Sequence, residues 1–285
     1  GKTLILIGAN TRLGFEAAKH FVKMNLARLV LTARVGKKGT EALTRIQQET
    51  GYRKAELWII DLANLSNVIT FTDRTIGHPL RGDWHGDLGV AYKQLRSWMF
   101  AIRMIPKLFQ TSRKRSVILR LMIVASDVYY WTTIDNGVIA GLSMLENLSD
   151  KDNCTKEVMN HRYFDSKWLN VLVACSLQLH VLSFLPITVM SVNPGFYGSH
   201  AEGGRAMLFS TEERSRQLVY GAVGLLDDEE KLRGKFIQMS EVVEKCNFVT
   251  SKDGKIVQDK VWGEMLDILG KIDPKVPDVA KAYLK

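Results

Sequence analysis

The first 76 residues alternate between short apolar runs and segments with helical spacing, and this alternation constrains the fold more than any other feature. The apolar runs predict strands at about 3–7, 28–33 and 55–60, and the segments that follow them predict helices at 13–25, 38–49 and 65–76. Strands that alternate with helices in this way form a parallel sheet with right-handed crossovers. We therefore expect an α/β fold with a doubly wound, mostly parallel sheet and helices on both faces.

The same alternation resumes after one irregular stretch. Residues 77–90 contain glycine, proline and charged residues, and they interrupt the pattern. Beyond them, periodicity predicts helices at about 91–110, 156–185, 211–226 and 255–270, and strands at 117–125, 187–192 and 235–239. No linker divides the chain, so we predict one domain over 1–285, with long loops at about 127–155 and 195–210 on the substrate side.

Composition argues against several classes of protein. Aliphatic runs such as Val117–Val124 are much shorter than the roughly 20 apolar residues of a membrane span, so we expect none. The three cysteines, Cys154, Cys175 and Cys246, are widely spaced and form no CxxC pair, which argues against a disulfide framework or a metal site. This cysteine usage, with no signal-like segment before the first strand, predicts the cytoplasm.

The net charge of +9 raises the question of nucleic-acid binding. The densest basic cluster, 112–120, includes an apolar strand and contains no aromatic residues. We interpret it as a solvated helix end and expect no nucleic-acid partner. An anionic cofactor would also suit a basic protein.

A turn with two glycines joins the first predicted strand to the first helix. Glycine lets backbone N–H groups approach a phosphate, and the helix N-terminus adds positive potential, as in the Rossmann fold. The candidate cofactor-binding residues of this turn are Gly8, Asn10, Thr11, Arg12, Leu13 and Gly14. A plain tight turn is the alternative explanation for the same pattern.

Two residues at strand ends also bear on the cofactor. Arg34 follows the second strand, where proteins that prefer NAD carry an acid for the ribose 2′-hydroxyl. An arginine there favours a 2′-phosphate, so the predicted cofactor is NADP(H). Asp61 ends the third strand and either faces an adenine amine or belongs to a helix N-cap region.

Tyr163 and Lys167 are four residues apart on the longest predicted helix and therefore share one face. A lysine ammonium near a phenol favours the phenolate and lowers its pKa from about 10, so the tyrosine could exchange the proton that accompanies hydride transfer. Ser126 ends the preceding strand at the carboxyl edge of the sheet, where a ligand crevice is expected. Its hydroxyl either binds a substrate oxygen or caps a local turn.

The sequence NPGFYGS follows the next strand, at 193–199. Pro194 and Gly195 fix a sharp turn, and with Phe196 and Ser199 they complete the candidate cofactor residues. Ser199 is the candidate partner of the nicotinamide amide. Without the other motifs, this segment indicates only a turn.

In order and spacing, these motifs resemble the short-chain dehydrogenase/reductase superfamily, and within it the fungal retinol-dehydrogenase-like members. The similarity extends over most of the chain. It includes the segment between Ser126 and Tyr163 and the tail KVWGEMLDILGKIDPKV. The matching motifs are IGANTRLG for the glycine turn, TAR for the NADP-type strand end, IIDL for the adenine-side Asp-Leu pair, IVAS, YFDSK and VNPGFYGS.

The resemblance implies a role for each matching residue and an oxidoreductase of fungal secondary metabolism. Tyr163 would be the catalytic acid/base, Lys167 the ribose anchor that modifies the phenol pKa, and Ser126 the partner of the substrate oxygen. Asp61 and Leu62 would lie on the adenine side of the cofactor.

Three features depart from the family pattern. Ile7 replaces the usual threonine and Arg12 the middle glycine of the turn, where a non-glycine residue at positive φ costs about 1–3 kcal/mol. The motif that ends the family's fourth strand is missing, so residues 87–92 either supply a substitute strand or leave a gap beside the first strand. Lys93 stands in place of a helix asparagine, which makes it a candidate catalytic residue near Tyr163.

Two functions are compatible with this sequence. One is an NADP(H)-dependent oxidoreductase that interconverts an alcohol and a ketone or aldehyde on a lipophilic small molecule. Residues 128–131, 137–145 and 195–198 suit either an apolar pocket rim or ordinary loop packing. The other is a divergent member without ordinary redox activity: a pseudoenzyme, an interaction protein, or an isomerase or cyclase that uses the old pocket. By analogy with the family, the two long helices would form a homodimer or homotetramer.

Overall fold

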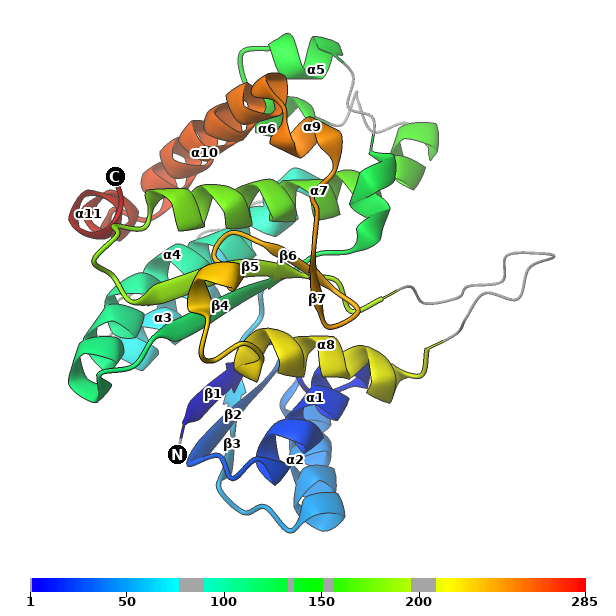
Figure 1. Ribbon diagram of the computed structural model, residues 1–285, viewed down its shortest axis with the longest axis vertical. Coiled ribbons are helices and arrows are strands. Elements are labelled where there is room, and N and C mark those ends of the chain that lie inside the picture. Colours follow the sequence, from blue (N-terminus) through cyan, green and yellow to red (C-terminus); the bar gives the residue numbers. More distant parts are fainter. Residues whose placement is uncertain (1, 77–89, 133–135, 151–155, 196–208) are drawn as a thin grey trace, which may run out of the picture.

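The computed structural model describes residues 2–76, 90–132, 136–150, 156–195 and 209–285 (Figure 1). Its strands are β1 (Thr3–Leu6), β2 (Arg28–Ala33), β3 (Ala55–Ile59), β4 (Leu119–Val124), β5 (Ile187–Val192), β6 (Phe236–Gln238) and β7 (Glu241–Val243). The longer helices are α1 (Arg12–Lys23), α2 (Gly36–Thr50), α3 (Leu65–Ile76), α4 (Val90–Arg115), α7 (Lys156–His180), α8 (Thr211–Val223), α10 (Lys252–Ile272) and α11 (Lys275–Tyr283). The short ones are α5 (Asn136–Ala140), α6 (Met144–Asn147), α9 (Asn247–Thr250) and the 3₁₀ turns η1 (Asp127–Trp131) and η2 (Glu229–Leu232).

The strands form two hydrogen-bonded sheets. β1, β2 and β3 pair in parallel, and β4, β5 and β6 pair in parallel with β7 added antiparallel at the edge. Among the described residues no strand joins β1 to β4. The sequence leaves two alternatives here, a substitute strand at 87–92 or a gap beside the first strand. Residues 90–92 begin helix α4, which rules them out as part of a substitute strand. Residues 77–89 lie outside the described part of the chain.

Both faces of the two sheets are covered by helices, as the sequence predicts. Successive side chains of a strand point to opposite faces. Accordingly, Val30 of β2 and Val189 of β5 belong to the core beneath α3, α4, α7 and α10, whereas Leu31 and Met190 belong to the core beneath α1, α2 and α8. Each core therefore includes residues from both sheets, which makes the two sheets one layered body.

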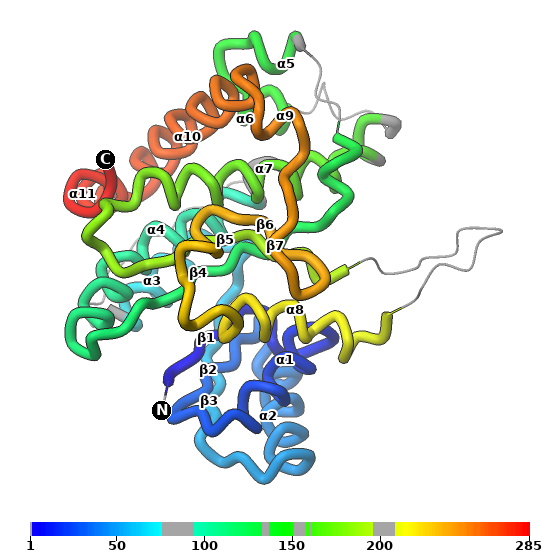
Figure 2. The backbone as a smooth tube through the Cα atoms, viewed as in Figure 1, coloured from blue at the N-terminus to red at the C-terminus, as the bar shows by residue number. Residues whose placement is uncertain are grey.

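Helix α8 bridges the break between the sheets. It packs on α1, next to the first sheet, and also against β4 and β5 of the second sheet. Figure 2 shows its path between the β1–β3 part and the β4–β7 part of the chain. Helix α8 therefore connects the two sheets through its packing.

The helix that carries Tyr163 and Lys167 ends earlier than the sequence predicts. Helix α7 stops at His180, not just before Pro186, because the C-terminus of the chain pairs with the following residues. Leu182 N donates to Tyr283 O at 3.1 Å, and Lys285 N donates to His180 O at 2.8 Å. These bonds replace the helical hydrogen bonds of the last turn.

The basic cluster at 112–120 contains the end of helix α4. Arg113, Lys114 and Arg115 form the exposed last turn of that helix, and Ser116 follows with a φ of 53°. Basic residues at a helix C-terminus oppose the negative end of its dipole. The interpretation of this cluster as a solvated helix end is therefore confirmed.

Candidate active site

The turn between β1 and α1 is held by the neighbouring strand. Gly8 N donates to Thr32 Oγ1 at 3.0 Å, and that hydroxyl donates to Leu6 O at 3.0 Å, while Ala9 N donates to Thr32 O at 3.2 Å. Gly14 lies directly against the turn, since a Cβ there would be 2.8 Å from Gly8 O. Only glycine at position 14 permits this close approach of helix and turn.

Arg12 begins helix α1 in the left-handed region, with a φ of 48°. Its side chain is exposed and makes no hydrogen bond or ion pair with the described residues. Thr11 occupies the N-cap without a side-chain hydrogen bond, and the first helical turn contains no acidic residue. Asn10 and Leu13 are half-buried beside them. The helix N-terminus therefore presents unneutralised positive potential and a free guanidinium.

The strand-end residues differ in their surroundings. Arg34 is exposed directly after β2, and its guanidinium makes no hydrogen bond or ion pair within the described part of the chain. Asp61 Oδ1 accepts a hydrogen bond from Ala63 N at 2.8 Å, so this carboxylate does organise the local turn before α3. Leu62 packs against the core on the α3–α4 side. An adenine contact of Asp61 and Leu62 stays a prediction.

Ser126, Tyr163 and Lys167 lie together at the carboxyl end of β4. The Tyr163 side chain is 55% exposed, whereas Ser126 is 7% exposed and immediately follows the buried Ala125. The Lys167 ammonium lies over the Tyr163 ring, with Nζ 5.4 Å from the ring centroid. Ser126 Oγ is 3.2 Å from Asp127 Oδ1, and a hydrogen bond also links Ser126 to the phenol. The three residues thus lie close together at this edge, and their catalytic roles stay predictions.

The electrostatics of Tyr163 differ from the prediction. Burial is the largest influence and raises the pKa of the phenol above its usual value, and the charge of Asp127 acts in the same direction. The hydrogen bond with Ser126 and the positive charge of Arg214 lower that pKa, but they do not compensate. Burial also lowers the pKa of Lys167. The prediction that the Lys167 ammonium lowers the phenol pKa toward working pH is therefore wrong for this structure.

The turn after β5 is the second motif at this edge, and side-chain hydrogen bonds fix its geometry. Gly195 has a φ of 96°, and its N–H donates to Asn193 Oδ1 at 2.9 Å across Pro194. From helix α8, Arg214 donates to Gly195 O through Nε at 3.1 Å and through Nη2 at 2.7 Å. Asn193 is fully buried, and its Nδ2 has no hydrogen-bond partner among the described residues.

Two supporting residues escaped the sequence reasoning. Asn170 lies on α7 and accepts a hydrogen bond from Trp98 Nε1 at 3.1 Å, while its Nδ2 donates to Val124 O at 3.1 Å. It thereby ties α4 and α7 to the end of β4, directly before the segment that carries Ser126. Arg214 is the other, and the capping-box pattern from Ser210 to Glu213 is the only local signal near it. Neither residue belongs to a motif that a single sequence reveals.

Three predicted site residues lie outside what the structure describes. Phe196 and Ser199 belong to 196–208, which is outside the described residues. Lys93 lies in helix α4, but its side chain is outside the described part. Their roles remain predictions.

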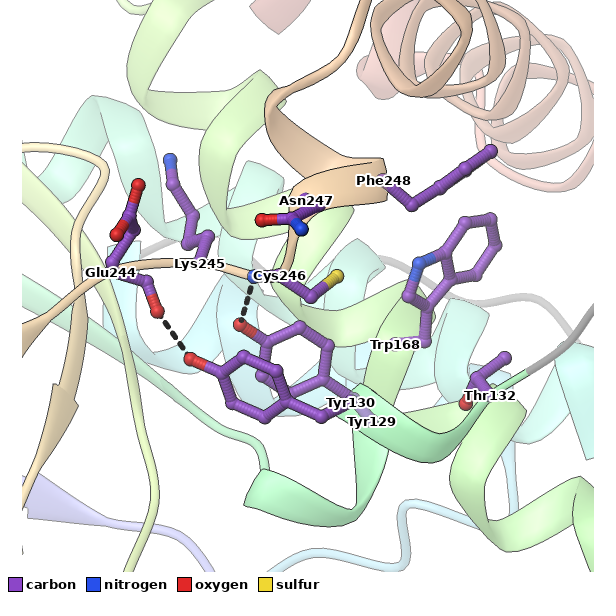
Figure 3. A pocket seen from close by; sticks show the side chains of 9 residues that line it. All are labelled: Tyr129, Tyr130, Thr132, Trp168, Glu244, Lys245, Cys246, Asn247 and Phe248. Atoms are coloured by element: carbon purple, nitrogen blue, oxygen red, sulfur yellow. Dashed lines mark hydrogen bonds between the residues drawn. The ribbon is translucent and has the colours of Figure 1, made fainter.

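A cavity of about 450 Å³ lies beside the candidate site, between η1, α7 and the chain that follows β7 (Figure 3). Its lining comprises Tyr129, Tyr130, Thr132, Trp168, Glu244, Lys245, Cys246, Asn247 and Phe248. The Tyr129 hydroxyl accepts from Cys246 N at 3.2 Å, and the Tyr130 hydroxyl donates to Glu244 O. These bonds fix two aromatic rings of the 128–131 segment in the cavity wall.

The described residues contain no group of three or more His, Cys, Asp or Glu side chains that could hold a metal ion. In the same part of the chain, no helix combines the length and apolar character needed to cross a membrane.

Helix α10 holds the end of the 137–145 segment. The Glu264 carboxylate of this helix accepts hydrogen bonds from Met144 N and Leu145 N, each at 2.9 Å.

The sequence is similar to those of known fungal dehydrogenases. The short chain dehydrogenase/reductase dmxR8 of Cryptosporiopsis sp. (strain 8999) is 29% identical over 97% of this chain and 93% of its own length. The short-chain dehydrogenase anuD of Penicillium roqueforti (strain FM164) is 26% identical over 97% of this chain and 79% of its own length. The chain is thus similar in sequence to fungal short-chain dehydrogenases/reductases over nearly its whole length. No model of a known protein family matches it.

The fold of short-chain dehydrogenases is also found in solved structures. YwfH, described as an NADPH-dependent reductase involved in bacilysin biosynthesis, superposes with a TM-score of 0.56 at 14% sequence identity. The superposition covers 84% of this chain and 98% of YwfH. At this level of identity the likeness establishes the Rossmann-type fold. The retinol-dehydrogenase-like subgroup within the family stays a prediction.

Proposed function

We propose that this protein is an NADP(H)-dependent oxidoreductase that interconverts an alcohol and a ketone or aldehyde on a lipophilic small molecule. The observation that carries the proposal is the convergence of Ser126, Tyr163 and Lys167 at the carboxyl end of β4. In a parallel α/β sheet, ligands bind outside the carboxyl ends of the strands. The names of the fungal relatives agree with this proposal. A role of this protein in fungal secondary metabolism is part of the same proposal.

The residues at this edge fit the phosphates of NADP(H). The approach of Gly14 to Gly8 leaves a cradle that a single Cβ would fill, at a helix N-terminus without acidic residues. Such a terminus binds anions through its free N–H groups. Arg12 and Arg34 add two exposed guanidinium groups at the ends of β1 and β2, suited to a pyrophosphate and a 2′-phosphate.

When bound, the nicotinamide cofactor supplies or accepts the hydride, and the protein side chains handle the proton. In carbonyl reduction, the Tyr163 phenol donates its proton to the substrate oxygen, and Ser126 donates a hydrogen bond to that oxygen. In alcohol oxidation the same groups act in reverse. The Lys167 ammonium lies over the Tyr163 ring and is available to a ribose hydroxyl, because it has no ion-pair partner in the described residues.

A lipophilic substrate suits the aromatic surface near the site. Tyr130 and Trp131, directly after the Ser126 strand end, are 40% and 58% exposed. Tyr130 also lines the adjacent cavity (Figure 3). Large apolar side chains that remain exposed beside a candidate site favour binding of an apolar molecule.

The break in the sheet favours a second candidate, a family member without ordinary redox activity. No strand supports the β1 side of the crevice among the described residues, and Arg12 adds a side chain where backbone would meet the pyrophosphate. A protein of this kind would retain Tyr163 and Ser126 for proton transfer alone, as in an isomerisation or cyclisation. It would bind no dinucleotide.

Association and location are proposed by analogy. A homodimer or homotetramer would use α4 and α7, but α11 packs on α4 and α10 packs on α7 within one chain. An interface between copies must therefore use the sides of these helices that α10 and α11 leave free. We propose the cytoplasm as the location and no nucleic-acid partner.

Purified full-length protein tests the proposed function directly. NADPH consumption is followed at 340 nm with a panel of lipophilic ketones and aldehydes, for the wild type and for Tyr163→Phe. We expect turnover of at least one carbonyl by the wild type and none by Tyr163→Phe, with the same thermal unfolding temperature. Equal turnover by both proteins would contradict the role of Tyr163.

A further inference from the structure

Helix α8 carries a cation that the family motifs do not include. Its first turn is fixed by a complete capping box, in which Ser210 Oγ accepts from Glu213 N at 3.2 Å and Glu213 Oε2 accepts from Ser210 N at 2.8 Å. Arg214 is the next residue, so its backbone position is set by this cap. The helix itself is anchored on α1, β4 and β5.

The Arg214 guanidinium binds the turn that follows β5 through hydrogen bonds. Both Nε and Nη2 donate to Gly195 O, at 3.1 and 2.7 Å. The same turn is held from the other side, because Asn193 Oδ1 accepts from Gly195 N at 2.9 Å. A Cβ at Gly195 would be 3.8 Å from Arg214 Cγ, so the arginine stem packs against the turn. Backbone at a φ of 96° is thus fixed by two side chains.

Arg214 also lies within electrostatic reach of Tyr163. The groups that act on the phenol come from three elements: Ser126 and Asp127 at the end of β4, Lys167 on α7, and Arg214 on α8. Asp127 disfavours the phenolate and Arg214 favours it. Lys167 faces the ring and is itself partly desolvated. The charge of Arg214 thus opposes the effect of Asp127 on the phenol.

We propose that Arg214 is a positioning residue of the reaction, which fixes the Gly195 turn and thereby holds its positive charge at the edge of the site that carries Tyr163. This inference deepens the proposed function and rests on it for the meaning of the Gly195 turn. The two parts of the role are separable, because lysine preserves the charge but has no planar fork to hold one carbonyl with two donors.

The charge is tested without cofactor or substrate. 3,5-Difluorotyrosine is placed at position 163, and its ¹⁹F chemical shift is followed against pH in the full chain. We expect Arg214→Met to raise the titration midpoint by about one pH unit, and Arg214→Lys to raise it by less. Arg216→Met is the matched control and leaves it unchanged, because Arg216 is exposed and pairs with Glu212 at 2.8 Å. An unchanged midpoint in Arg214→Met would overturn this half of the proposal.

The turn is tested by NADPH binding, measured by fluorescence titration. We expect both Arg214→Met and Arg214→Lys to weaken NADPH binding about tenfold, as loss of a charge-assisted hydrogen bond predicts, with no change in Arg216→Met. Unaltered binding in both Arg214 variants would overturn the positioning of Gly195. If the wild type binds no NADPH, the proposed function fails, whereas the ¹⁹F titration still decides whether Arg214 acts on Tyr163.

Discussion

The Lys167 ammonium lies over the face of the Tyr163 ring, with Nζ 5.4 Å from the centroid, and makes no hydrogen bond to the phenol. A cation in this position interacts with the ring quadrupole more than with the oxygen. The phenol oxygen is governed instead by burial, by Ser126 and by Arg214. The pKa of the phenol is therefore above its usual value, and the phenol is protonated at neutral pH.

This electrostatic arrangement predicts different pH dependences for the two reaction directions. Burial raises the pKa of Tyr163, so the phenol is protonated at neutral pH and can act as an acid. We expect kcat/KM for carbonyl reduction to be flat near neutral pH and to fall only as pH approaches the phenol pKa. Alcohol oxidation needs the phenolate, so its kcat/KM rises about tenfold per pH unit over the same range. An oxidation rate already independent of pH near 7 would contradict the raised pKa.

We expect replacement of Arg12 by glycine to stabilise the fold and to weaken NADPH binding. At a φ of 48°, Arg12→Gly relieves left-handed strain, part of which is offset by the greater freedom of glycine in the unfolded chain. We expect the free energy of unfolding in urea to rise by about 0.5–1 kcal/mol and NADPH to bind about tenfold more weakly, since the guanidinium is lost. Tighter NADPH binding by Arg12→Gly would mean that Arg12 obstructs the turn. Lys2→Gly, in the exposed N-terminal residues before β1, is a control for added glycine.

Arg34 predicts the choice between the two nicotinamide cofactors. Its exposed guanidinium follows β2, and nothing in the described residues neutralises it. We expect Arg34→Ala to weaken NADPH binding about tenfold while NADH binding changes by less than about twofold, because only NADPH carries the 2′-phosphate. Equal weakening of both cofactors would place Arg34 at a phosphate that they share.

We expect the buried ion pairs of Arg103 to stabilise the α3–α4–α11 side of the protein. It is 1% exposed, pairs with Asp73, and donates to Asp273 Oδ2 at 2.8 Å and to Thr72 Oγ1 at 3.1 Å. Removing Arg103 leaves the buried Asp273 carboxylate without its counter-ion and leaves Asp73 with Lys275 alone. We expect Arg103→Met to lower the free energy of unfolding by about 3–5 kcal/mol.

Lys114→Met is the control for this variant, because Lys114 lies in the exposed last turn of α4. It should change the free energy of unfolding by less than about 0.5 kcal/mol. A comparably small effect of Arg103→Met would show that the buried network contributes little to stability.

Local signals predicted the order of strands and helices. β2 and β5 have the bounds that the apolar runs indicate, because both are buried strands flanked by turn residues. The end of α7 was beyond reach, since it depends on backbone pairing of Leu182 with Tyr283, about a hundred residues away in sequence. Helix α11 was missed altogether.

In the candidate site, too, the local features could be predicted from the sequence and the features that depend on tertiary contacts could not. The motif residues Ser126, Tyr163 and Lys167 were predicted because their spacing and strand-end positions are local features. The direction of the Tyr163 pKa depends on burial, and the place of Arg214 depends on a contact between α8 and the turn after β5, neither of which a local pattern encodes.

A fluorescence titration of the full chain with NADPH tests the central claim most directly, since the oxidoreductase role assigned to the carboxyl edge of β1 and β4 requires a bound dinucleotide. The account predicts saturable binding with a Kd in the micromolar range, about −8 kcal/mol. A chain that is folded by circular dichroism yet shows no binding up to millimolar NADPH would contradict it.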